Sequence, residues 1–423
     1  MRQNINKVLL NHFSNGGGAA AYLRGVIPSL TEDVEKLFST RSDINRIKVA
    51  ELLSEKILSL TDFSDLIPLR DEVATLEIKR LINYRKQTDH TAHTVYLFLL
   101  GIWVYDNNHQ LRKMVDDSIK SNKTAKMFIF QWIFASLLHD VGYLFFDYKN
   151  TDNKDSWGKF DDMFKAKYIP DYLSKRIEKN KDTFQMLCKE FVEKYNPKLV
   201  HSDKLSTKAL LDQLNSIPWI EDIIGEKLSG LQVLLAHFDI NKELINFAED
   251  IAIKGYDGKG DNPQIDHAIA SGLMLLKYTS VWYWLYKKAK EEYPDLHEEL
   301  NSNYRYPKEV FINHVIPACR AVIYHNIVKL QCDYNKEPLL YLAILCDELQ
   351  FWDRFWSGPE YIDNWKNVNH CMAEQVYANV ISNEFYEEQL HILMPKEQYN
   401  KLSSTLKERL NDYGRFVKLT ELG

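Results

Sequence analysis

The sequence has few residues that interrupt helices, and it lacks a long apolar run. Glycine and proline number only 16 and 12 among 423 residues, and alternation of apolar and polar residues is scarce. The longest apolar run, Met127 to Leu138, contains Gln131 and Ser136 and is too short to span a bilayer. We therefore expect an all-α protein without a membrane-spanning segment.

Paired cysteines and clustered basic residues are also absent from the sequence. The five cysteines are scattered, with no Cys-x-x-Cys pair, which is typical of reduced, buried thiols in a cytoplasmic protein. The N-terminus lacks the apolar core of a signal peptide. The net charge is −6 and there is no run of Lys and Arg, so neither a membrane nor a nucleic acid is indicated as a partner. The oligomeric state stays open.

Helical patterns and changes in composition divide the chain into five segments. We predict helices over residues 30–60, 71–105, 124–146, 264–290, 307–330 and 338–356. Lys, Asp and Asn become frequent after Asp147, which indicates an insertion. The predicted segments are an N-terminal helical segment (1–70), a first core half (71–146), an insertion or lid (147–261), a second core half (262–356) and a C-terminal helical extension (357–423).

Histidine and aspartate recur on the apolar segments in a pattern that suits metal binding. His90 and His93 are three residues apart and share a face of the predicted helix. His139 and Asp140 close an apolar run, where two neighbouring side chains can converge on one ion, and Asp347 lies on a distant helix. Two His and two Asp ligands would leave positions on the metal for water and substrate, as a catalytic site requires.

The order of these motifs resembles that of the HD superfamily of metal-dependent phosphohydrolases, over residues 80–146 and 262–356. The resemblance implies an HD-domain helical core with an inserted, mainly helical region and a C-terminal extension. It implies a metal site formed by four ligands, which are His93, His139, Asp140 and Asp347. His93 is preferred to His90 as the first ligand, because Thr and Val follow it at the positions usual in the superfamily.

Two further segments are similar to one branch of this superfamily. They are Asp266 to Gly272 and Ala321 to Asn326, and the similarity implies that His267 and His325 add ligands for a second metal. The alternative is a single metal, with these two histidines binding substrate phosphate. The mixed N and O ligands suit Mn, Fe, Co, Ni, Zn or Mg, so we expect one or two divalent ions without choosing among them.

The implied activity is hydrolysis of a small phosphate ester, such as a nucleotide, by a metal-bound hydroxide. Asp140 would bridge two metals, and His90 is the candidate general acid for the leaving group. Arg85, Arg354 and Lys259 are candidates for binding the substrate phosphate. For each of these three basic residues the alternative is a solvated surface charge.

Other functions compatible with the same motifs are a phosphodiesterase acting on a cyclic or oligonucleotide, and a non-catalytic nucleotide-sensing module that regulates a partner. A di-iron oxygenase on the same fold is a third alternative. Hydrolysis of cyclic di-GMP is not supported. Leu144 follows Gly142 and Tyr143, where the corresponding Gly-Tyr-Pro motif has proline, and this stretch comes directly after His-Asp-Val, which is not the position of that motif.

Overall fold

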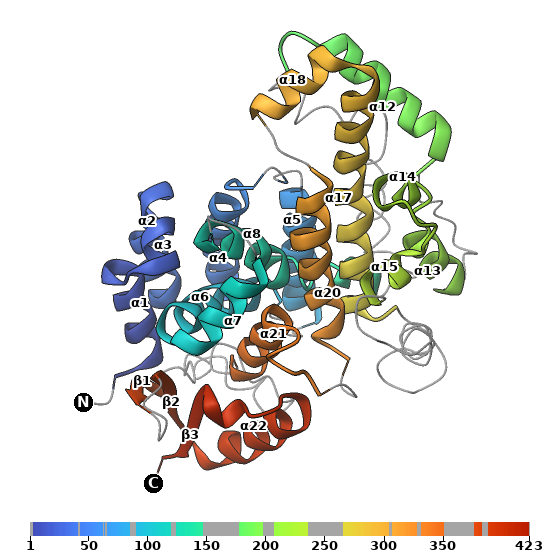
Figure 1. Ribbon diagram of the computed structural model, residues 1–423. Helices are drawn as coiled ribbons and strands as arrows, with labels where there is room; N and C mark the ends of the chain where they lie inside the picture. The colour runs from blue at the N-terminus through green and yellow to red at the C-terminus, as the bar shows by residue number, and fades with distance from the viewer. Residues whose placement is uncertain are drawn as a thin grey trace. The chain divides into compact units, whose positions relative to one another are not determined.

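Helices dominate the structure, as the sequence predicts. The computed structural model describes residues 3–40, 43–61, 63, 66–84, 90–119, 124–146, 177–197, 207–235, 265–303, 307–327, 331–350, 376–382 and 388–422. Within these ranges the fold is all-α apart from one three-stranded sheet near the C-terminus (Figure 1). Among the described helices, none combines the length and apolar character needed to cross a bilayer.

The chain divides into two compact units. Unit 1 contains residues 1–60, 73–138 and 325–423, and unit 2 contains residues 61–72 and 139–324. The division differs from the five expected segments, because unit 2 joins the insertion to most of the second core half. The described parts of the insertion are helical, as expected.

Unit 1 contains the sheet and the helices that precede α9 (Tyr143–Phe146) and follow α20 (Ile316–Tyr324). Its elements are α1 (Ile5–Asn15), α2 (Gly18–Val26), α3 (Leu30–Ser39), α4 (Asp43–Leu58), most of α5 (Ile67–Tyr84), α6 (Thr91–Asn107), α7 (His109–Ile119), α8 (Thr124–Leu137), α21 (Pro338–Leu349), β1 (Tyr377–Ser382), β2 (Glu388–Met394), α22 (Lys396–Arg409), the 3-10 turn η6 (Tyr413–Arg415) and β3 (Val417–Glu421). The apolar helices α6 and α8 pack directly on each other. At their crossing a Cβ on Gly101 would lie 1.9 Å from the Trp132 ring, so only glycine permits this approach.

The glycine-rich stretch near the N-terminus is a tight junction between two helices. α1 ends at Asn15, and α2 begins at Gly18, which has a positive φ of 59°. The buried Asp106 carboxylate accepts hydrogen bonds from the amides of Ala19 and Ala20, at 2.8 and 3.0 Å, and lies 3.0 Å from His12 Nε2. Asp106 therefore caps the start of α2 from the far end of α6.

The sheet is the main departure from the expected C-terminal helical extension. β1 is antiparallel to β2, β2 is parallel to β3, and α22 connects β2 to β3 (Figure 1). Most of β2 is buried, so it lacks the alternation that marks a half-exposed strand in a sequence. Residues 357–375, 383–387 and 423 of the extension lie outside the described residues.

Unit 2 is organised around the long helix α17. Its elements are α9 (Tyr143–Phe146), α12 (Lys181–Tyr195), α13 (Thr207–Asn215), α14 (Ile220–Ile224), α15 (Gly230–Leu235), α17 (His267–Glu292), α18 (Pro294–Asn303), and the consecutive turns of α19 (Lys308–Val310), the π-helical η3 (Phe311–Val315) and α20 (Ile316–Tyr324). α20 runs alongside α17, and the insertion helices α12 to α15 also pack on α17 (Figure 1). Because the insertion shares an apolar core with α17, the two form one unit.

A buried lysine links the insertion to α17. Lys277, only 3% exposed, donates from Nζ to the carbonyl oxygens of Gln213 (3.1 Å) and Ser216 (2.6 Å). The ammonium also lies 5.0 Å from the centre of the Trp219 ring. Burial lowers the pKa of Lys277 to about 7.

The depressed pKa of Lys277 predicts a pH-dependent contribution to stability. Between pH 7 and about 10 the unfolded lysine holds a proton that the folded one releases, so the free energy of unfolding should rise with pH in this window. Replacing Lys277 with Met should remove a slope of up to about 1 kcal/mol per pH unit, measured by urea unfolding at pH 7, 8 and 9. The matched variant Lys290→Met, on the exposed end of α17, should keep the wild-type slope. Equal slopes in all three proteins would contradict the prediction.

Candidate metal centre

The first predicted ligand lies in the first turn of a buried helix. The expected single helix over 71–105 is two helices, α5 and α6, and His90 lies directly before α6. His93 is 1% exposed, whereas His90 is partly exposed. His93 is therefore placed in the interior, and His90 has a side that a solute can reach.

A buried acid on α5 holds the start of α6. The Glu77 carboxylate accepts hydrogen bonds from the backbone amides of His90 and Thr91, with Thr91 N at 3.1 Å from Oε2. Amides in the first turn of a helix have no partner within the helix, so a carboxylate satisfies them and favours the helix dipole. Sequence reasoning missed Glu77, because it lies more than ten residues upstream and its partner is backbone.

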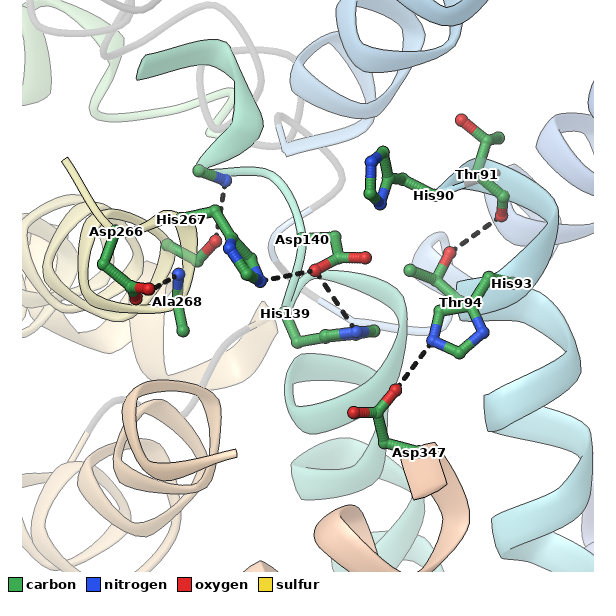
Figure 2. Close-up of polar contacts among 12 residues, drawn as sticks. His90, Thr91, His93, Thr94, His139, Asp140, Asp266, His267, Ala268 and Asp347 are labelled. Carbon is green, nitrogen blue, oxygen red and sulfur yellow. Dashed lines mark hydrogen bonds and ion pairs between the residues drawn. The ribbon is translucent and has the colours of Figure 1, made fainter. Parts of the chain in front are cut away.

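Two of the predicted ligands meet directly within unit 1. His93 Nε2 lies 2.8 Å from Asp347 Oδ1, although the two residues are 254 positions apart (Figure 2). Asp347 lies in the last turn of α21, which packs on α6. Both residues belong to the set of four metal ligands that the resemblance implies.

The His-Asp pair of unit 2 lies in a turn, not in a helix. α8 ends at Leu137, so the expected helix over 124–146 is interrupted by a turn before α9. His139 Nε2 lies 3.3 Å from Asp140 Oδ1, and both residues are buried. The two neighbouring side chains therefore converge, as the sequence indicates for adjacent residues at a helix end.

His267 of α17 joins this pair. Its Nε2 lies 3.4 Å from the same Asp140 Oδ1 (Figure 2). Its ring stacks on that of Tyr143, with 4.2 Å between the ring centroids. Asp266 precedes α17 and accepts from the amides of Ala268 and Ile269, at 3.0 and 3.1 Å. This N-cap sets the first turn of α17, and hence the position of His267.

The turn that carries His139 and Asp140 depends on a glycine. Gly142 N donates to Ser271 Oγ at 2.6 Å, and a Cβ on Gly142 would lie 2.0 Å from the carbonyl oxygen of His267. The Gly after the His-Asp pair therefore permits the turn to lie directly against α17.

The last predicted ligand, His325, follows the end of α20 and is 5% exposed. Within unit 1, Arg409 of α22 donates to the carbonyl oxygen of His325 and pairs with the carboxylate of Glu348. Glu348 is the neighbour of Asp347. The C-terminal segment thus contacts the backbone or side chains beside two predicted ligands, a role that sequence reasoning did not assign to it.

The donor atoms suit a divalent ion. His93, His139, Asp140, His325 and Asp347 have side-chain atoms that could hold a metal. Two ligands of one ion with bonds of about 2.1 Å lie about 3.0 to 3.4 Å apart in octahedral or tetrahedral geometry. The pair in unit 1, at 2.8 Å, and the two contacts of Asp140 in unit 2, at 3.3 and 3.4 Å, are close to this spacing. The same distances suit direct His–Asp hydrogen bonds.

The three basic residues expected to bind phosphate, Arg85, Lys259 and Arg354, lie outside the described residues. Comparison of the chain with protein-family models, curated proteins and solved structures found no match. The similarity to the HD superfamily therefore rests on the motifs of the sequence.

Substitution of Gly142 tests the turn. Gly142→Ala should displace the turn from α17, lowering the free energy of unfolding by about 2 kcal/mol and metal affinity by about tenfold or more. Thermal unfolding and titration with Mn²⁺ or Zn²⁺ would measure both. The control is Gly25→Ala, whose Cβ would meet nothing within 4 Å. Gly142→Ala with wild-type stability and metal affinity would contradict the assignment.

Substitution of Glu77 tests the cap on α6. Glu77→Gln keeps the size but removes the charge at the helix start, so the free energy of unfolding should fall by about 1 kcal/mol. Glu55→Gln on the exposed face of α4 removes the same charge and should have little effect. Chemical denaturation of both variants at pH 7 is the measurement, and equal losses would argue against the cap.

Proposed function

We propose that the protein is a metal-dependent phosphohydrolase that acts on a nucleotide or a related small phosphate ester. The observation that carries the proposal is the motif order His, His-Asp, distant Asp, together with the 2.8 Å approach of His93 and Asp347. His93 is buried and Asp347 is partly buried, and such a pair on two helices far apart in sequence is costly to maintain unless both groups are used or satisfied. The pairing supports a shared ligand role.

The ligand set is proposed from the order of the motifs. His93, His139, Asp140 and Asp347 would hold the first ion. His267 Nε2 lies 3.4 Å from Asp140 Oδ1, so these two residues would hold a second ion. His325 would add a ligand for that ion.

One or two bound divalent ions would activate water and polarise a phosphoryl oxygen. His93 lies on α6, His139 and Asp140 follow α8, and His267 begins α17. Each of these helices is apolar and buried along most of its length. His90 is partly exposed at the start of α6, where it could donate a proton to the leaving oxygen. Its backbone is held there by Glu77.

The decisive test is substitution of Asp140, which contacts both His139 and His267 in unit 2. Asp140→Asn should lower bound metal and reduce hydrolysis of bis-p-nitrophenyl phosphate and of a nucleotide panel by at least about 100-fold. Elemental analysis of the purified protein and a phosphate-release assay with added Mn²⁺ provide the two measurements. Asp117→Asn, an exposed acid on α7, is the matched control and should behave as wild type.

The two measurements separate the competing functions. Full hydrolytic activity in Asp140→Asn would refute the proposal. A wild-type protein that binds nucleotide but takes up no metal, even with added Mn²⁺, would favour the nucleotide-sensing module instead. Iron with strong visible absorption would favour the oxygenase.

A further inference from the structure

A cavity of about 800 Å³ lies in the C-terminal part of unit 1, apart from the predicted ligands. The residues around it come from the end of α22, the turn η6 and the strands β1, β2 and β3, with Gln331 from the segment before α21. A volume of this size is that of a small-molecule or cofactor site. None of the residues around the cavity has a role in the proposed hydrolysis.

The lining is basic and polar. Lys407, Arg415 and Lys418 contribute three positive charges to the lining, and Asp412 is the one acid among its described residues. Within the described part of the chain, neither Lys407 nor Lys418 forms an ion pair, and both are exposed. These two exposed lysines, gathered on one concave surface, favour an anionic ligand.

The positions of these cations are set by the fold around them. Arg415 donates to the hydroxyl of Tyr334 at 3.2 Å, which orients the guanidinium. Gln389 of β2, which is 6% exposed, donates to the carbonyl of Gly414 and so holds the turn before Arg415. Lys418 projects from β3, beside β2. A guanidinium held in this way adds a fixed positive charge to the wall of the cavity.

The rest of the lining suits the part of a ligand that bears no charge. Leu410 and Ile381 are apolar, and Tyr413 offers an aromatic ring. A ligand that combines phosphate groups with an organic body would match both parts of the cavity. Inorganic phosphate alone would leave most of the volume unused.

The cavity wall is connected by hydrogen bonds to two segments that carry predicted metal ligands. Cys332, next to Gln331, donates its amide to the carbonyl of Arg409 at 2.7 Å, and Asn411 returns a bond to the Cys332 carbonyl at 3.1 Å. The Arg409 side chain in turn binds the carbonyl of His325 and the carboxylate of Glu348. Arg409 lies between Lys407 and Leu410, which line the cavity.

We propose that this cavity binds a phosphorylated small molecule as an effector, and that Arg409 transmits its occupancy to the segments of His325 and Asp347. The binding step is independent of the proposed hydrolysis. Only an effect of the bound molecule on hydrolysis rests on the proposed function.

Binding is tested by calorimetry with ATP as the probe, in EDTA, so that no metal site contributes. The full-length wild type should bind ATP, and Lys407→Gln/Lys418→Gln should weaken the affinity by about tenfold or more. The control Lys396→Gln/Lys401→Gln removes two charges from exposed positions of α22 away from the cavity, and should bind as wild type. Equal affinity in the two double variants, or no binding by wild type, would overturn the proposal.

Transmission is tested by hydrogen exchange in the same buffer, with and without ATP. In wild type, ATP should slow exchange in residues 316–327 and 338–350. Arg409→Lys keeps the charge but cannot contact the His325 carbonyl and the Glu348 carboxylate at the same time. In this variant the protection should be lost while ATP still binds. Glu348→Gln removes the partner carboxylate and serves as a second variant. Unchanged protection in both variants would refute transmission, and because neither experiment measures hydrolysis, the outcome is separate from that of the proposed function.

Discussion

The central constraint on this structure is that polar groups at the ends of buried helices must find partners away from water. Every predicted ligand lies in the first or last turn of a helix or directly beyond its end. His93 is in the first turn of α6, and His267 is the first residue of α17. Asp347 is in the last turn of α21, while His139 and His325 follow the ends of α8 and α20. Side chains there can point beyond the helix, but the backbone groups beside them remain to be satisfied.

The partners that meet this requirement also position the candidate site. Glu77 holds the amides at the start of α6, Asp266 holds those at the start of α17, and Arg409 holds the carbonyl of His325. Each contact stabilises a helix end and at the same time holds the backbone beside a predicted ligand. Stability and the geometry of the site are therefore coupled, and substitutions at these supports act on both.

The C-terminal segment gains a role from the same constraint. α22 and the sheet could form a separate appendage, but Arg409 and the bridge at Cys332 attach them to the backbone beside the predicted ligands. The basic cavity that we propose as an effector site lies on this attachment. In unit 2 the insertion is joined to α17 in a comparable way, through the buried Lys277.

The sequence by itself determined the helical character, the convergence of His139 with Asp140 and the candidates for ligands, because these depend on local periodicity and on adjacent residues. The tertiary structure alone decided that α5 and α6 are separate helices, that β2 is a strand, and that His93 meets Asp347. It also identified Glu77 and Arg409, whose partners are backbone groups or side chains far along the chain. Such contacts leave no periodic signal, because they are set by which helix ends pack together in space.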